Sequence, residues 1–202
     1  MHEHAIAHLT KSDKVLARLI RQVGPCRLEP RRTHSPFQSL VQAVAHQQLN
    51  GTAANTILKR VIALYPRQKF PAPEDLLETP DDHLRGAGLS RAKVASIKDI
   101  AAKSLEGVIP ATKAIMKMSD VEIVERLTTI RGVGPWTVEM LLIFKLGRLD
   151  VLPATDYGVR KGFAATYRRK QLPTPAELLE HGERWRPYRS IASWYLWRSL
   201  DD

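Results

Sequence analysis

The stretch "LTTIRGVGPWTVEMLLIF", residues 127–144, decides the fold of this chain. Apolar residues at helical spacing lead into Gly132 and Gly134, which are one residue apart, and Pro135 then opens a second helical pattern. Glycine can adopt positive φ and lets another backbone approach closely, because it has no Cβ. The stretch therefore predicts two helices joined by a tight hairpin, with Trp136 at the start of the second helix.

Helical spacing of apolar residues continues on both sides of this hairpin, and no segment shows the alternation of a β-strand. Ser35-Pro36 and Thr174-Pro175 are typical helix N-termini. We predict an all-α protein of about ten helices, a single domain over residues 1–202 without an obvious linker. The first residues, MHEHAIAHLTK, we expect to be frayed. The expected helices cover about 14–23, 36–50, 52–64, 74–78, 81–85, 90–105, 119–128, 135–144 and 156–167, and the last two begin near 174 and 187.

The chain is strongly basic, with a formal net charge of +10 and a pI of about 9.9. Lys and Arg are spread through the whole chain and do not form a tail. A basic globular domain suits a polyanion, and nucleic acid is the commonest polyanion. A basic surface that serves only solubility is the alternative that charge leaves open.

Several kinds of site are excluded by composition. The one cysteine, Cys26, cannot form an internal disulfide or supply the thiolates of an iron–sulfur cluster or structural zinc site. The seven histidines lack the spacing of a metal-binding motif. No apolar run is long enough to cross a membrane, and the N-terminus lacks the layout of a signal peptide. We therefore expect a cytoplasmic protein without a membrane partner.

The hairpin has the chemistry of a phosphate-binding element. Backbone N–H groups around Gly132 and Gly134, and in the first turn of the next helix up to Thr137, would point at an approaching anion. Such contacts bind a nucleic-acid backbone without reading its sequence. A hairpin of this kind can equally be a plain joint between two helices, and the basic charge favours the DNA-binding interpretation.

A set of ordered motifs resembles the helix-hairpin-helix DNA glycosylases over about residues 35–200. The hairpin is followed by "PATDYGVRKG" (153–162) and "ERWRPYRSIASWYLWRSL" (183–200). It is preceded by "FQSLVQAVAHQQLNGTAANTILKRV" (37–61) and "LRGAGLSRAKVASIKDIA" (84–101). The resemblance implies a two-lobed all-α fold with the active site in the cleft between lobes. One lobe would cover about 35–143, and the other 1–34 together with 144–202.

Within that superfamily the chain is most similar to the alkylpurine branch, 3-methyladenine DNA glycosylase II, in a form without the N-terminal β domain of the bacterial prototype. Trp136 occupies the position of the Schiff-base lysine in bifunctional members, so the amine nucleophile is missing. The cysteine cluster of the endonuclease III branch is also absent. The resemblance implies a monomer that flips an alkylated purine out of double-stranded DNA and hydrolyses its N-glycosidic bond, without a lyase step.

Asp156 is the catalytic residue that the resemblance implies. Hydrolysis of an N-glycosidic bond develops positive charge on the sugar, and a fixed carboxylate stabilises that oxocarbenium ion. The carboxylate could also orient or deprotonate the attacking water. The alternative is that Asp156 only caps the helix that it begins.

Four residues are expected to line the substrate pocket: Trp136, Trp197, Met140 and Tyr157. The base in 3-methyladenine or 7-methylguanine is cationic, and an indole ring stacked on it gains cation–π attraction. Met140 lies one turn after Trp136, where the prototype has tyrosine. Trp197 could instead belong to the core, and Tyr157 could pack inward.

The resemblance also implies contacts outside the pocket. Gln48 takes the position of the residue inserted into the DNA gap, where the prototype has leucine, although it could simply cap a helix end. Main-chain carbonyls of Thr128, Ile130 and Val133 could hold Na⁺ or K⁺, and no other cofactor is expected. Two other functions stay open: a glycosylase for ethenoadenine, hypoxanthine or uracil, and a helix-hairpin-helix module that binds DNA without catalysis.

Overall fold

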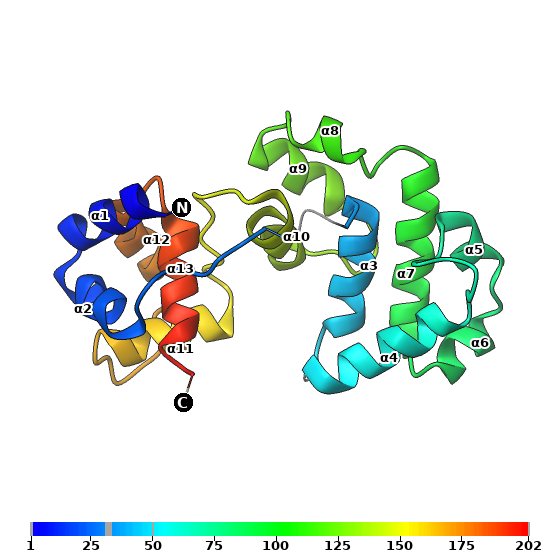
Figure 1. Ribbon diagram of the computed structural model, residues 1–202, viewed down its shortest axis with the longest axis horizontal. Helices are drawn as coiled ribbons and strands as arrows, with labels where there is room; N and C mark the ends of the chain where they lie inside the picture. The colour runs from blue at the N-terminus through cyan, green and yellow to red at the C-terminus, as the bar shows by residue number, and fades with distance from the viewer. Residues whose placement is uncertain (1, 31–33, 50, 202) are drawn as a thin grey trace. The chain divides into compact units, whose positions relative to one another are not determined.

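The computed structural model describes residues 2–30, 34–49 and 51–201, and every regular element in these ranges is a helix (Figure 1). None of these helices is long and apolar enough to cross a membrane. The elements are α1 (Glu3–Ser12), α2 (Lys14–Val23), α3 (Pro36–His46), α4 (Gly51–Ala63), α5 (Pro73–Glu78), α6 (Asp81–Gly86), α7 (Arg91–Leu105), α8 (Thr112–Ile115), α9 (Asp120–Leu127), α10 (Pro135–Leu141), the π-helix η1 (Leu142–Leu146), α11 (Tyr157–Thr166), α12 (Pro175–Gly182), the 3₁₀-helix η2 (Glu183–Trp185) and α13 (Arg189–Arg198).

The all-α prediction is confirmed, but the N-terminal segment differs from expectation. The residues expected to be frayed form α1, in which Leu9 is fully buried. A hydrogen bond between His2 Nε2 and the Leu28 carbonyl, 2.9 Å long, adds a contact to a distant loop. α8 and η1 were also not expected as separate elements. Tertiary contacts therefore order this end of the chain despite its weak local signals.

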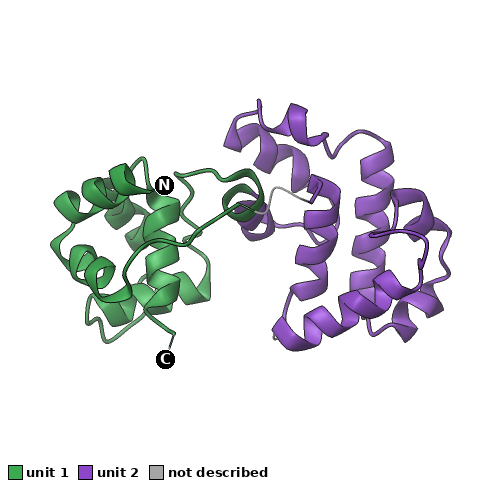
Figure 2. Ribbon diagram, in the orientation of Figure 1, with its two compact units in different colours: residues 1–30, 142–202 green, residues 31–141 purple. Residues whose placement is uncertain are grey.

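The chain forms two compact units (Figure 2). Unit 1 contains residues 1–30 and 142–202, and unit 2 contains residues 31–141. The boundaries expected from the sequence lie near residues 34 and 143. The hairpin between α9 and α10 belongs to unit 2, whereas Asp156 and Trp197 belong to unit 1.

Unit 2 is organised around α7, which packs against α3, α5 and α6. Ser90 caps α7 by accepting a hydrogen bond from the backbone N–H of Lys93, and Ser35 forms a capping box with Gln38 at the start of α3. The apolar faces of these helices are buried, with Val41 and Ile100 fully so. This core supports the hairpin, because α3 also contacts α10.

Unit 1 is built on α11 and α13, which lie against each other and both contact α2. A Cβ added to Gly162 of α11 would lie 2.0 Å from the carbonyl oxygen of Leu196 in α13, so only glycine permits this helix packing. Tyr195 of α13 is fully buried and donates a hydrogen bond to the Gly24 carbonyl at 2.8 Å. This close packing fixes α13 beside the helix that follows Asp156.

A buried carboxylate, Asp13, ties α2 to the C-terminal part of unit 1. It caps α2 and accepts hydrogen bonds from the side chains of Tyr167 at 2.6 Å, His181 at 3.0 Å and Trp185 at 3.0 Å. Burial raises the pKa of Asp13, but the hydrogen bonds from His181, Tyr167, the Leu16 N–H and Trp185 outweigh it and hold the pKa well below its usual range. The ionised carboxylate is therefore the stable form in the folded state.

Candidate active site

Of the two hairpin glycines, only Gly132 uses positive φ, with a value of 75°. A Cβ at this position would lie 2.3 Å from Ser96 Oγ and 2.8 Å from Ser96 Cβ, so the turn also needs the space that glycine leaves. Gly134 has neither requirement, because its φ is not positive and nothing lies within 4 Å of an added Cβ. The folded chain itself gives no reason for glycine at position 134.

α7 and α3 hold the hairpin in place by long-range hydrogen bonds. Asp99 of α7 accepts the backbone N–H of Arg131 at 2.7 Å. Gln47, the C-cap of α3, donates its side-chain amide to the Gly132 carbonyl at 3.0 Å and to Thr137 Oγ1 at 3.2 Å. The hairpin is therefore held by side chains from both helices.

The backbone N–H groups of Gly132 and Gly134 have no hydrogen-bond acceptor among the described residues. Gly132 is exposed and Gly134 half-buried, so both can be reached from solvent. Thr137 is 2% exposed and its hydroxyl accepts from Gln47, which leaves only its backbone for a phosphate. Ile130 accepts the N–H of Val133 at 3.1 Å, and the cation expected at the carbonyls of Thr128, Ile130 and Val133 stays a prediction.

Gln48 follows the end of α3 with φ +56°, the left-handed region that disfavours a residue with a Cβ. It is exposed, and the next residue, Leu49, is 40% exposed. Gln47 packs against the hairpin, so it is Gln48 and Leu49 that this turn presents to solvent. The sequence analysis missed Leu49, although a leucine directly after Gln48 was a visible signal for an apolar side chain at this turn.

Two basic residues of the matched motifs, Lys93 and Arg160, have partners within the protein. Lys93 donates to the Ala45 carbonyl at 2.8 Å near the C-terminal end of α3, and burial lowers the pKa of its ammonium group. Arg160 donates through Nε to the Pro173 carbonyl at 2.8 Å. Both side chains therefore stabilise the fold, whether or not they also contact DNA.

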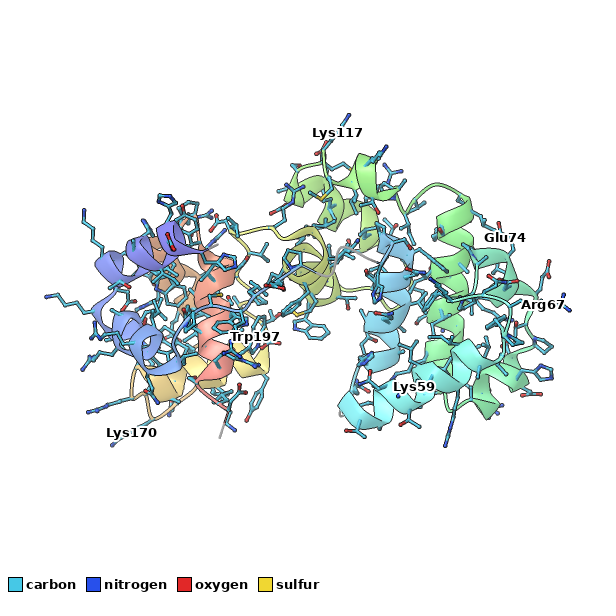
Figure 3. All side chains as sticks on the ribbon, in the orientation of Figure 1. Lys59, Arg67, Glu74, Lys117, Lys170 and Trp197 are labelled. Atoms are coloured by element: carbon cyan, nitrogen blue, oxygen red, sulfur yellow. The ribbon has the colours of Figure 1, made fainter. Side chains whose placement is uncertain are left out.

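Asp156 caps α11, and its carboxylate also contacts α13 (Figure 3 labels Trp197, the partner residue on α13). Oδ1 accepts the backbone N–H of Val159 at 2.7 Å and the indole N–H of Trp197 at 2.9 Å. Two donors from different helices fix the plane of the carboxylate. The capping role is thus real, but it does not account for the bond from Trp197.

The contact between Trp197 and Asp156 depends on Gly158. A Cβ at position 158 would lie 2.9 Å from Trp197 Cδ1 and 3.1 Å from Asp156 Oδ1. Phe144 also packs against Trp197, and the centroids of their two rings are 5.6 Å apart. Because an indole pressed between these groups has little freedom, Trp197 is a positioning residue for Asp156. The expectation that it also lines the substrate pocket stays a prediction.

The other expected pocket residues are exposed or half-buried. Tyr157 is 64% exposed, which excludes the alternative that it packs inward. Trp136 is 37% exposed at the start of α10, and Met140 lies one helical turn further and is half-buried. A tryptophan with this exposed fraction is unusual in a core.

Sequence analysis also missed the residues that hold these groups. Gln47, Ser96 and Asp99 support the hairpin, and Gly158 leaves room for Trp197. Unit 2 thus contains a hairpin with two accessible N–H groups, and unit 1 contains a carboxylate that accepts an indole N–H, as the resemblance to the helix-hairpin-helix DNA glycosylases implies.

Comparisons with known proteins agree with this class. A model of the HhH-GPD superfamily of base excision DNA repair proteins matches residues 41–187. DNA-3-methyladenine glycosylase 1 of Schizosaccharomyces pombe is 40% identical over 195 residues, which cover 95% of this chain and 85% of that protein. The chain belongs to the HhH-GPD superfamily.

Solved structures give the same result. The 3-methyladenine DNA glycosylase Mag1 of Schizosaccharomyces pombe, in complex with abasic DNA, superposes with a TM-score of 0.89 at 39% identity and covers 96% of this chain and 95% of its own. A DNA-3-methyladenine glycosidase from Bacillus halodurans has a TM-score of 0.84 at 33% identity, and the match covers 96% of this chain and 88% of the Bacillus halodurans chain. The predicted fold class is confirmed.

Proposed function

We propose that this protein is a monofunctional DNA glycosylase that removes N-alkylated purines such as 3-methyladenine and 7-methylguanine from double-stranded DNA. The similarity to 3-methyladenine DNA glycosylases supports the substrate class. The observation that carries the chemistry is the Asp156 carboxylate, which the Val159 and Trp197 N–H groups hold in one orientation.

The bond from C1′ to the base nitrogen breaks with its electron pair moving to the base. An alkylated purine is cationic, so it leaves as a neutral molecule and needs no protonation by the enzyme. The sugar becomes an oxocarbenium ion, which the negative charge of Asp156 stabilises. Water then adds to C1′, its proton passes to Asp156 and on to solvent, and the product is an abasic site.

DNA binding would precede this step. The free N–H groups of Gly132 and Gly134 would take a backbone phosphate, with Na⁺ or K⁺ on the hairpin carbonyls, and no other cofactor would be needed. Gln48 and Leu49 would fill the space that the flipped nucleotide leaves, and Trp136 would stack on the cationic base. The enzyme would work where the DNA is, in the bacterial cytoplasm or the eukaryotic nucleus.

The test is release of free base from duplexes that each carry one lesion. The panel contains 3-methyladenine, 7-methylguanine, ethenoadenine, hypoxanthine or uracil. Asp156→Asn keeps an oxygen that can accept from Val159 and Trp197, so we expect a folded protein with parental DNA affinity and at least a hundredfold slower excision, about the worth of one charged transition-state contact. Asp82→Asn removes an exposed carboxylate of unit 2 and serves as the control.

Each result has one meaning. Release of methylated purines by the parent and the control, but not by Asp156→Asn, supports the proposal. Release of only another lesion would refute the substrate class, and binding without release of any base would leave a DNA-binding module. Excision by Asp156→Asn at the parental rate would refute the catalytic role of Asp156.

A further inference from the structure

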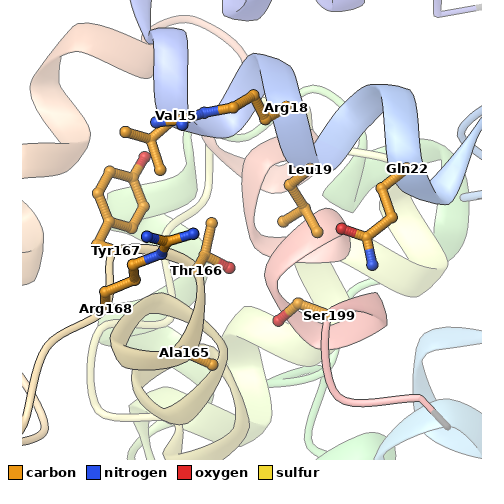
Figure 4. Close-up of a pocket in the computed structure, with 9 residues that line it drawn as sticks. All are labelled: Val15, Arg18, Leu19, Gln22, Ala165, Thr166, Tyr167, Arg168 and Ser199. Atoms are coloured by element: carbon orange, nitrogen blue, oxygen red, sulfur yellow. The ribbon is translucent and has the colours of Figure 1, made fainter.

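Unit 1 contains a cavity of about 420 Å³ that includes none of the residues assigned to the reaction (Figure 4). One wall is the face of α2 that carries Arg18 and Gln22, and the other is the C-terminal end of α11 with Thr166 and Arg168. Pockets for small organic molecules have volumes of about 300–1,000 Å³. The cavity is therefore large enough for a ligand bigger than a simple ion.

Two guanidinium groups line this cavity without a partner. Neither Arg18 nor Arg168 forms an ion pair or a side-chain hydrogen bond within the described part of the chain. The neighbouring Arg169, by contrast, pairs with Glu177 at 3.3 Å. Asp13 accepts the hydroxyl of the lining residue Tyr167 but is buried and pairs with neither arginine. The cavity thus carries positive charge that no residue of the described ranges neutralises.

The backbone at Arg168 indicates that its side chain is needed there. Arg168 follows the end of α11 with φ +53°, and the N–H of Arg169 bonds to the Ala164 carbonyl at 2.8 Å. Glycine is the usual residue at this place in a helix C-terminus, because a Cβ is disfavoured at positive φ. A strained residue that persists points to a use for its side chain. Figure 4 shows the guanidinium of Arg168 directed toward α2.

The remaining lining groups add polar and apolar contacts. The Gln22 amide is exposed, and the Thr166 hydroxyl is buried without a hydrogen-bond partner among the described residues. Threonine in a helix populates two χ1 rotamers, so its hydroxyl can turn to a ligand oxygen. Val15 and Leu19 of α2 give the cavity an apolar part. The lining therefore suits a ligand with an anionic end and an organic body.

We propose that this cavity binds a small phosphomonoester, such as a 5′-nucleoside monophosphate. Guanidinium groups bind phosphoryl oxygens in a bidentate manner, and two of them match a dianion better than a carboxylate. The apolar residues would contact the organic body. α11 separates this cavity from Asp156 by its length, about 15 Å for ten residues. The site is distinct from the one that binds DNA lesions, and it does not depend on the proposed function.

Calorimetric titration of the full chain with deoxyadenosine 5′-monophosphate tests the proposal, with deoxyadenosine as the ligand control. We expect a dissociation constant of about 1 mM or lower for the monophosphate and no measurable binding of the nucleoside. Arg18→Ala should weaken binding about tenfold or more. Arg21→Ala should not, because Arg21 is exposed on the same helix but does not line the cavity.

Arg168→Gly separates binding from folding. It removes the guanidinium and also relieves the positive φ, so the melting temperature should equal or exceed that of the parent while the affinity falls about tenfold. The same titration with a DNA strand that carries a 5′-phosphate, and with the same strand ending in a 5′-hydroxyl, shows whether the cavity binds the phosphoryl group of a DNA end. Absence of binding by both phosphate ligands would overturn the proposal, as would equal losses in Arg18→Ala and Arg21→Ala.

Discussion

The same substitution at two hairpin glycines should have opposite effects. Gly132→Ala places a residue with a Cβ at φ +75° and brings that Cβ to 2.3 Å from Ser96 Oγ. A left-handed residue costs about 1–2 kcal/mol and an overpacked contact about 1–3 kcal/mol, so we expect unit 2 to lose roughly 2–5 kcal/mol of stability. Ser96→Gly removes both atoms that the Cβ would meet, so the double variant should recover the packing part only.

Gly134→Ala should leave the fold intact. Its φ is not positive and no atom lies within 4 Å of the added Cβ. Alanine reduces the conformational entropy of the unfolded chain, so the unfolding free energy should rise by about 0.4–1 kcal/mol. A phosphate at the N–H of Gly134 would, however, be held off by the methyl group. Loss of one or two charged hydrogen bonds, each worth about 1.5–3 kcal/mol, weakens DNA binding by roughly tenfold to a hundredfold or more.

Guanidinium denaturation gives the stability of each variant, and fluorescence anisotropy with a labelled abasic duplex gives its affinity at constant salt. The expected pattern is an unstable Gly132→Ala and a stable Gly134→Ala that binds weakly. If Gly134→Ala binds DNA as tightly as the parent, the hairpin is only a joint between helices. If it unfolds as easily as Gly132→Ala, the account of the turn is wrong.

Three further predictions concern other elements. Gly158→Ala should displace Trp197 from Asp156 and slow single-turnover excision about tenfold to a hundredfold with unchanged DNA affinity; parental turnover would exclude the positioning role. Gln48→Gly relieves φ +56° and should raise the melting temperature while slowing excision of a fully paired lesion, and unchanged excision would contradict its insertion into DNA. Asp13→Asn should lower unfolding free energy at pH 7 by about 1–3 kcal/mol. The pKa of Asp13 is depressed in the folded protein, so the ionised carboxylate contributes its full stability above the unfolded pKa of about 3.9. This stability is lost as the pH falls through the folded pKa. The unfolding free energies of the parent and Asp13→Asn, measured at decreasing pH, should therefore converge.

Local patterns predicted most of the fold. Asp13, Ser35, Ser90 and Ser119 each cap the helix that the sequence indicated, and the apolar faces behind them are buried. The strongest single signal was the glycine pair with Pro135, which does separate α9 from α10. Asp156 also begins its helix as expected. These features depend on neighbouring residues, so the sequence alone contains them.

The features that were missed depend on contacts distant in sequence. α1 has no side-chain cap, and it is ordered by burial of Leu9 against the rest of unit 1. Gln47 reaches Gly132 across 85 residues, and Asp99 reaches Arg131 across 32. The need for glycine at position 158 appears only when Trp197, 39 residues later, is placed beside it. No periodicity or capping signal reports such pairs.

The double use of the Asp156 carboxylate has a consequence for how this protein can change. In many enzymes the reactive group lowers the stability of its own scaffold, so that an inactivated variant is sturdier than the natural protein. Here the same oxygen begins α11 and receives Trp197. Under the proposed function, truncation to alanine would remove the cap of α11 and the acceptor for Trp197 and would also slow excision, so loss of the carboxylate would lower both stability and activity. Asparagine, which keeps an acceptor oxygen, would separate the two effects.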